Sequence, residues 1–345
     1  MNLLITGGCG FIGSHFIEHL LRHHPDYKVV NLDAMTYAAH PQTKEFLQNL
    51  APSRYSFVHG DIGSALVGEI IKTHDIDTIV NFAAESHVDR SILDPGSFVQ
   101  TNVVGVQNLL YWARKLGNVR FVQVSTDEVY GSLEPSDASF TEHSHLVPSS
   151  PYSASKACAD LLALSCFRTF RQEIVITRCS NNFGPRQFPE KLLPLVIANA
   201  LEGKSIPVYG DGRQVRDWIF VADHCKAIDQ VMHQGKLGEV YNISSNQEVP
   251  NLEIISKILQ ILDKPASLIT FVKDRPAHDR RYALNSNKIR QQLGWVPATG
   301  FEEGLSRTIH WYIENSAWWK QLRDKAFFDY YTANYKAKFT PEAKL

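Results

Sequence analysis

Three glycines that follow the first apolar segment constrain the fold of this chain more than any other feature. Residues 2–6 predict a buried strand, Gly7, Gly10 and Gly13 follow at once, and residues 14–22 have the apolar spacing of a helix. Glycine lets the backbone turn tightly and approach a pyrophosphate, which then lies at the positive N-terminus of the helix. This order predicts an α/β fold with a Rossmann-type, doubly wound parallel sheet.

An acidic residue ends the second predicted strand, residues 28–32. Asp33 lies 20 residues after Gly13. A carboxylate there can accept hydrogen bonds from both ribose hydroxyls and repels a 2′-phosphate, so NAD is favoured over NADP. A structural turn with a solvated aspartate is the alternative. It is the weaker one because the strand, the helix and the acid all agree.

Composition and charge narrow the class of protein further. The 345 residues leave room for two lobes, and a net charge of −1 makes nucleic acid an unexpected partner. No apolar run is long enough to span a bilayer, so we expect no membrane partner. The five cysteines lack a CxxC spacing, so we expect reduced thiols, no metal site and a cytoplasmic location.

A buried strand that ends in polar side chains marks the expected reactive part of the chain. The apolar run 121–124 leads directly into Ser125, Thr126, Asp127 and Glu128. Ligands of open α/β sheets bind outside the carboxyl ends of the strands. A hydroxyl and two acids there can orient an oxygen, donate one proton and accept another. The alternative is a helix cap, which these residue types also suit.

Tyr152 and Lys156 are four residues apart at the start of a predicted helix that continues to residue 170. At this spacing both side chains lie on one helix face. The ammonium is expected to lower the pKa of the phenol, and the phenolate can then take a proton from a hydroxyl as hydride leaves. Such pairs also arise by chance. This one gains weight because it follows a dinucleotide loop and a Ser-Thr strand end.

The pattern of alternating strands and helices becomes less regular after residue 178, and residues 179–185 read as a polar turn. We expect an NAD-binding domain over residues 1–178 and about 217–243. A smaller α/β substrate-binding domain is expected over 179–216 and 244–325, followed by an aromatic tail, 326–345, that packs across the lobes or at a subunit contact. Arginines of the smaller domain can bind phosphate or form surface ion pairs.

Together these motifs resemble the extended short-chain dehydrogenase/reductases that act on nucleotide sugars. Residues 83–91, 125–131, 179–185 and 275–282 narrow the resemblance to the dTDP-glucose 4,6-dehydratase family, and the match spans nearly the whole chain. The Thr-Asp-Glu triplet is the most telling part, because related epimerases tend to have a small or apolar residue at these acidic positions.

The resemblance implies a lyase that converts dTDP-glucose to dTDP-4-keto-6-deoxyglucose with NAD as cofactor. Tyr152, helped by Lys156 and Thr126, would remove the C4 hydroxyl proton. Glu128 would take the C5 proton, and Asp127 would protonate the departing C6 hydroxyl. Asp127 must then be protonated near neutral pH, and burial beside an anionic Glu128 would raise its pKa.

The resemblance also implies binding residues and a homodimer. The dimer would form through two helices of the first lobe, about 97–116 and 152–170. NAD would be contacted by the glycine loop and by Phe11, Ile12, Asp33, Ala34, Thr36, Asp61, Ile62, Ala83, Ala84, Thr101, Tyr152, Lys156 and Asn182. The nucleotide sugar would be contacted by His87, Thr126, Asn181, Lys191, Leu192, Pro207, Tyr209, Arg216, Asn251, Arg275 and His278. Arg216 and Arg275 are the expected diphosphate ligands.

Two residues depart from the family pattern near the expected nucleotide site. Ala277 stands where the family usually has glycine, and Arg186 follows the Gly-Pro turn where an aromatic or small polar residue is more usual. Three alternatives stay open: a 4,6-dehydratase of UDP-glucose, a 4-epimerase or uronate decarboxylase, and a non-catalytic nucleotide sensor. The Asp127–Glu128 pair argues against the epimerase, and the Tyr152–Lys156 pair against the sensor.

Overall fold

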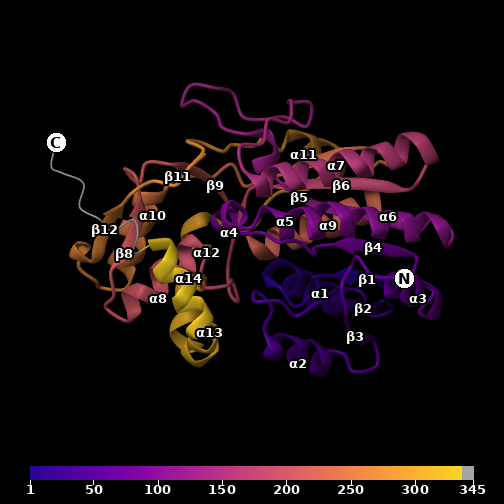
Figure 1. The fold of residues 1–345 in the computed structure, drawn as a ribbon, viewed down its shortest axis with the longest axis horizontal. Helices are drawn as coiled ribbons and strands as arrows, with labels where there is room; N and C mark the ends of the chain where they lie inside the picture. The colour runs from indigo at the N-terminus through magenta and orange to yellow at the C-terminus, as the bar shows by residue number, and fades with distance from the viewer. Residues whose placement is uncertain (336–345) are drawn as a thin grey trace.

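Seven parallel strands form the main sheet, in the order β10-β6-β5-β4-β1-β2-β3 (Figure 1). The computed structural model describes residues 1–335, without the side chains of 325–326 and 333–335. The predicted doubly wound parallel sheet is confirmed. The strands are β1 (Asn2–Thr6), β2 (Lys28–Asp33), β3 (Tyr55–His59), β4 (Thr78–Asn81), β5 (Arg120–Thr126), β6 (Ile174–Cys179) and β10 (Val240–Ile243).

Helices cover both faces of this sheet, because successive strand residues point to opposite sides. Leu3 and Ile5 of β1 join the core under one set of helices, whereas Leu4 joins the core under the other. The first set is α1 (Phe11–His23), α2 (Pro41–Leu50), α9 (Val221–Gln234) and α11 (Asn287–Leu293). The second set is α3 (Leu66–Thr73), α6 (Val106–Lys115) and α7 (Pro151–Phe170).

The helix expected over residues 97–116 is interrupted. It consists of α5 (Pro95–Val99), a π-helical turn η1 (Gln100–Gly105) and α6. In the π turn, the Asn102 amide oxygen accepts from the backbone N–H of Glu85, and its amide nitrogen donates to the Glu85 carbonyl, both at 2.9 Å. The turn therefore fixes the loop after β4, where α4 (Val88–Leu93) begins.

A smaller part with its own core lies beside the main sheet, on the left in Figure 1. Residues 181–183, expected within a polar turn, instead form strand β7, since Phe183 packs against Trp218, Phe220 and Phe301. The other elements are β8 (Ile206–Tyr209), β9 (Val215–Phe220), β11 (Glu248–Pro250), β12 (Ile269–Val272), α8 (Leu192–Leu201), α10 (Asn251–Ile261), η3 (Ala266–Leu268) and α12 (Phe301–Glu314).

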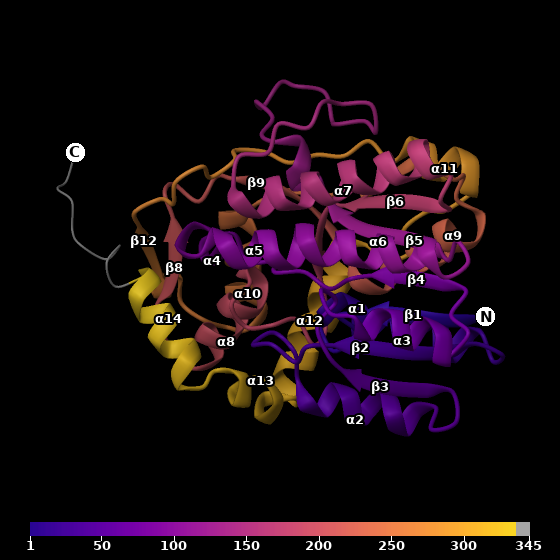
Figure 2. The same cartoon turned by 45° about the vertical axis from the view of Figure 1, so that its right-hand side comes forward.

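The end of the described chain runs along both parts (Figure 2). Helices α13 (Ser316–Leu322) and α14 (Lys325–Tyr335) follow α12. Phe327 of α14 packs in a cluster with Phe188, Leu195 and Val272, while the Tyr330 ring meets that of His87 edge-on at 5.8 Å. The described part of the tail therefore packs across the two parts, which was one of the two placements expected.

The described helices and strands also bear on two predictions, the absence of a membrane span and the domain boundaries. In the described residues, no helix is both long and apolar enough to cross a membrane. The domain boundaries stay a prediction. In the structure, β9 lies in the small sheet with β7 and β11, whereas α9 and β10 return to the main sheet.

Candidate active site

The glycine loop folds into a cradle at the carboxyl end of β1. Gly7 has φ +69°, a conformation that other residues adopt with strain. A Cβ on Gly7 would lie 2.7 Å from the Ala83 backbone nitrogen, and one on Gly13 would lie 2.4 Å from the Gly7 carbonyl oxygen. Helix α1 begins at Phe11, so its N-terminus faces the pocket that this loop lines. These residues fit a dinucleotide whose pyrophosphate lies against the helix N-terminus.

The Asp33 carboxylate closes the cradle at the end of β2. One oxygen accepts from the backbone N–H of Cys9 and the other from that of Met35, each at 2.8 Å. Burial raises the pKa of Asp33, and these two hydrogen bonds act in the opposite direction. A fixed carboxylate beside the glycine loop suits a ribose diol and disfavours a 2′-phosphate.

The two predicted catalytic acids follow β5 in a short helix, η2 (Asp127–Tyr130). Asp127 is buried, and the Thr126 hydroxyl donates to its Oδ1 at 3.2 Å. Oδ2 has no hydrogen-bond partner among the described residues. Burial and the neighbouring charges of Glu128 and Asp217 raise the pKa of Asp127 well above its usual value. The expected direction is confirmed, and the neutral acid is the form suited to proton donation at neutral pH.

Three cations surround the second acid, Glu128. Burial raises its pKa, while the charges of Arg275, Lys191 and Arg216 favour the ionised form. The Lys191 ammonium also donates to the Ser86 carbonyl at 2.6 Å. Asp127 and Glu128 therefore occupy different electrostatic settings, which suits one acid and one base.

Lys156 was expected to lower the pKa of Tyr152, but the net direction in the structure is the opposite. The pKa of Tyr152 is raised well above its usual value by burial and by the charge of Glu128. Lys156 instead donates to the Val124 carbonyl at 2.7 Å, and burial lowers its own pKa. Both side chains do line the same pocket as Thr126, as the helix spacing predicted.

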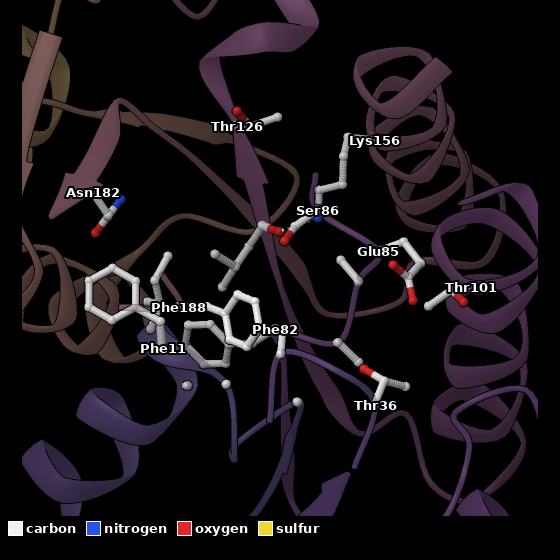
Figure 3. A pocket seen from close by; sticks show the side chains of 18 of the residues that line it. Phe11, Thr36, Phe82, Glu85, Ser86, Thr101, Thr126, Lys156, Asn182 and Phe188 are labelled. Atoms are coloured by element: carbon white, nitrogen blue, oxygen red, sulfur yellow. Dashed lines mark hydrogen bonds between the residues drawn. The ribbon is translucent and has the colours of Figure 1, made fainter. Parts of the chain in front are cut away.

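One pocket collects every residue predicted to contact NAD, together with all five predicted catalytic residues. Figure 3 shows the rings of Phe11, Phe82 and Phe188 lower in the pocket, with Thr126 and Lys156 above them. Of the predicted sugar-nucleotide residues, Thr126, Asn181 and Lys191 line this pocket as well. Their roles stay predictions, but their convergence on one cavity agrees with those roles.

The remaining predicted sugar-nucleotide residues are not among those that line this pocket. The Arg275 guanidinium lies 3.3 Å from Oδ1 of Asp89. The other oxygen of that carboxylate, Oδ2, accepts a hydrogen bond from the Tyr209 hydroxyl at 2.8 Å. The His278 ring meets the Tyr209 ring edge-on at 5.9 Å. Leu192 begins α8, Pro207 lies in β8 and Asn251 begins α10.

Arg216 is held inward, because its guanidinium donates to the Val215 and Asp279 carbonyls and lies 4.3 Å from the Tyr282 ring centre. Burial lowers its pKa, although its neighbours include the ionisable Glu128 and Asp127. A cation in this position can bind an anionic ligand without first leaving an exposed ion pair.

His87 is buried at the N-terminal end of α4. Burial lowers its pKa to about 4, so the ring is neutral at neutral pH and is not a cation for the diphosphate. Its Nδ1 lies 3.3 Å from the Tyr330 hydroxyl. Sequence reasoning gave Tyr330 no role, because nothing local places a residue of the last helix beside β4.

Several pocket residues were missed by the sequence analysis. Glu85, Ser86, Phe188 and Glu190 line the pocket, and Glu190 accepts from Arg90 at 3.1 Å. The sequence offered one local signal for them. Glu85 and Ser86 lie within the family-like segment 83–91, and Phe188 and Glu190 follow the family-like segment 179–185 closely.

Arg186, one of the two departures from the family pattern, does not lie near the nucleotide site, where we expected it. Arg186 lies on the flank of α1, 2.7 Å from a Glu18 oxygen and 5.1 Å from the Phe46 ring centre, and not among the residues around Glu128. Arg186 therefore gives no reason to favour UDP-glucose over dTDP-glucose as the substrate. Ala277 has φ +52°, so the loop keeps a left-handed residue at the position where glycine is usual.

The fold and the pocket together define an NAD-dependent enzyme of the short-chain dehydrogenase/reductase class, with a tyrosine–lysine pair and two acids at the strand end. Residues 4–308 match the family described as GDP-mannose 4,6 dehydratase. The chain is 48% identical to a dTDP-glucose 4,6-dehydratase of Xanthomonas campestris pv. campestris (strain B100), covering 94% of this chain and 96% of that protein. An Escherichia coli enzyme of the same name is 45% identical, over 95% of this chain and 98% of the enzyme. This chain belongs to the dTDP-glucose 4,6-dehydratase family.

Solved structures agree with this assignment. The dTDP-glucose 4,6-dehydratase of Bacillus anthracis str. Ames, in complex with NAD, superposes with a TM-score of 0.87 at 47% identity, over 93% of this chain and 99% of that one. A UDP-glucuronic acid 4-epimerase from Bacillus cereus has the same fold, with a TM-score of 0.83, but only 28% identity over 91% of this chain and 99% of the epimerase. The sequence therefore lies nearer to the dehydratases than to this epimerase.

Proposed function

We propose that this enzyme removes water from dTDP-glucose to give dTDP-4-keto-6-deoxyglucose. The observation that carries the proposal is the pair Asp127–Glu128, held at the end of β5 in the same pocket as Tyr152 and Lys156. An epimerase needs the tyrosine and the lysine but has no use for a second proton donor and a base. When bound, NAD takes a hydride from C4 of the sugar and later returns it to C6.

The first task of the protein is to oxidise the sugar at C4. Tyr152 takes the proton of the C4 hydroxyl, and the Thr126 hydroxyl orients the oxygen. Because the pKa of Tyr152 is raised in the protein without ligands, a further positive charge must favour the phenolate before Tyr152 can act as a base. The positive charge of the oxidised nicotinamide ring is the candidate, because Lys156 is already in place in the structure where the pKa of Tyr152 is raised.

The second task is elimination of water, and the two acids divide it. The 4-ketone acidifies the C5 hydrogen, which Glu128 removes as a proton, so that a C5–C6 double bond forms. Asp127 gives its proton to the C6 hydroxyl, the C6–O bond breaks and water leaves. A proton returns from Glu128 to C5, and the proton taken from the C4 hydroxyl balances the one that Asp127 supplied.

A substrate screen tests this function. The purified enzyme is incubated with dTDP-glucose, UDP-glucose and GDP-glucose, and the products are weighed by mass spectrometry. We expect a loss of one water, fastest with dTDP-glucose. Faster dehydration of UDP-glucose would move the proposal to that substrate, and a product of unchanged mass would indicate the epimerase.

Asp127→Asn separates the two stages. We expect water loss to slow about 100-fold, within the range of general acid catalysis, while C4 oxidation continues and reduced cofactor accumulates. The exposed Asp211, which pairs with Arg280 at 2.9 Å, gives the matched control Asp211→Asn. Equal slowing of both stages by Asp127→Asn would contradict the assigned role.

We also propose that the enzyme is a cytoplasmic homodimer formed through α5, α6 and α7. The support is a set of exposed apolar side chains on this side of the molecule, including Val99, Tyr111 and Leu161, the last 57% exposed. The five free cysteines suit a reducing compartment. Leu161→Asp should shift the mass measured by light scattering from dimer to monomer, and an unchanged dimer would exclude this surface.

A further inference from the structure

A cluster of histidines lies between the end of α1 and the middle of α9, apart from the pocket. His19 belongs to α1, His24 is its C-terminal cap, and Asp229 and His233 belong to α9. None of them lines the pocket. His19 and His24 follow Phe11, the first residue of α1, by 8 and 13 residues, so their backbones lie about 12 to 20 Å along the helix axis from the dinucleotide cradle.

Three of these residues direct their ligand atoms to a single point. The Nε2 atoms of His19 and His24 lie 2.8 and 2.9 Å from the same carboxylate oxygen, Asp229 Oδ2. Within the described part of the chain, this is the one group of histidine, cysteine or acidic residues whose ligand atoms converge in this way, all within 4.8 Å of one another. The side chains of His19 and Asp229 are 13% and 15% exposed and that of His24 is 26% exposed, so the point is sheltered but open to solvent.

The packing around the three side chains fixes their orientation. The His24 ring is stacked on Tyr27 with centres 4.3 Å apart, and the His19 ring is stacked on His23 at 4.4 Å. The second oxygen of Asp229 lies 3.0 Å from His233 Nδ1.

The elements that carry these side chains are rigid as well. Helices α1 and α9 share a buried core that includes Phe16, Leu20 and Ile228. The Arg54 guanidinium donates to the Leu21 and His24 carbonyls at the end of α1. Ligands held on two packed helices lose little freedom when they bind a metal ion.

We propose that His19, His24 and Asp229 form a binding site for a zinc ion that joins α1 to α9. Two imidazole nitrogens and one carboxylate oxygen are ligands that zinc accepts, and a water molecule would complete four-coordination. In the bound state each Nε2 directs its lone pair at the ion, so each neutral ring carries its hydrogen on Nδ1. The site is structural, because it lies far from the reacting groups.

Without an ion, His19 and His24 each donate a hydrogen bond from Nε2 to the Asp229 carboxylate, and both give up this hydrogen bond when the ion binds. A simple hydrogen-bonded clamp between the two helices is the competing explanation, and it needs no ion.

The test is a zinc titration of the NAD-loaded enzyme, stripped with EDTA and prepared without a histidine tag. Isothermal calorimetry should show one saturable zinc ion per chain. Thermal unfolding should rise by about 3 °C or more at saturating zinc, since the ion binds the folded state alone. A crystal soaked with zinc should show one anomalous-scattering peak between His19, His24 and Asp229.

Variants identify the ligands and control for zinc bound by other histidines. His24→Asn should weaken zinc binding at least tenfold and abolish the thermal shift. The control His143→Asn changes an exposed histidine of the loop before α7 and should alter neither. Turnover of dTDP-glucose by both variants without zinc confirms that they are folded. Equal zinc binding by wild type and His24→Asn, or no saturable binding up to about 1 mM zinc, would overturn the proposal and leave the hydrogen-bonded clamp.

Discussion

The dinucleotide half of the site draws its residues from the ends of neighbouring parallel strands, whereas the half around Glu128 draws them from segments far apart in the chain. In the first half, the loops after β1, β2 and β4 meet because these strands pair directly. In the second half, Arg275 from the loop after β12 meets Asp89 of α4, 186 residues away. The first half is a property of the sheet, and the second is a property of how two parts pack.

This difference predicts that the two halves fail separately. A change in the strand-end loops should remove the cofactor, and a change in the outer arginines should remove the substrate while the cofactor stays bound. Tyr152 lies where the halves meet, so its loss should stop the chemistry and spare both ligands.

Tyr152→Phe should have the largest effect. Without the phenol hydroxyl no group removes the C4 proton, and we expect turnover of dTDP-glucose to fall about 1000-fold. Bound NAD, measured by absorbance after denaturation, and the affinity for dTDP, measured by calorimetry, should stay within about twofold. A loss of NAD from this variant would show that the halves are not independent at Tyr152.

Gly13→Ala should have the second largest effect, a loss of bound NAD. The added Cβ would lie 2.4 Å from the Gly7 carbonyl oxygen, so the loop must shift away from the pyrophosphate position. We expect the NAD content of the purified enzyme to fall at least about tenfold, since positioned backbone contacts are lost. Gly117→Ala is not a suitable control because of its φ of +114°, whereas Gly300→Ala meets nothing within 4 Å and should retain NAD.

Arg275→Ala should weaken substrate binding in the half of the site around Glu128. Loss of a charge-assisted hydrogen bond to the diphosphate should raise KM for dTDP-glucose about 10- to 100-fold with NAD content unchanged. Arg280→Ala removes an exposed ion pair with Asp211 and serves as the matched control. A KM increase of similar size in both variants would contradict a specific role for Arg275.

Asp127→Asn should also have a small effect on stability. The folded state raises the pKa of Asp127, so its buried carboxyl binds a proton that the unfolded chain releases near its usual pKa. The free energy of unfolding that this group contributes in the wild type is fully present below its usual pKa. It declines as the pH rises from that value toward the raised pKa of the folded state. The variant should gain on the order of 1 kcal/mol relative to wild type between acidic and neutral pH, measured by urea unfolding. An unchanged difference across this range would argue that Asp127 titrates normally.

The amino-acid sequence by itself determined the dinucleotide half. Gly7, Asp33, Thr126 and Tyr152 each directly follow a predicted strand or begin a predicted helix. Parallel strands bring their carboxyl ends to one edge, so local patterns were enough to gather these residues. The opposed roles of Asp127 and Glu128 come from the family resemblance and stay a prediction; the sequence itself predicted only that an anionic neighbour and burial would raise the pKa of Asp127.

Tertiary structure alone decided the rest. The contact of Tyr330 with His87, the inward position of Arg216, the displacement of Arg186 from the nucleotide site and the meeting of His19 with Asp229 depend on which surfaces pack together. Packing between distant segments leaves no periodic trace in the chain, because each partner is locally an ordinary loop or helix residue. The raised pKa of Tyr152 has the same origin, since burial is a property of the whole fold.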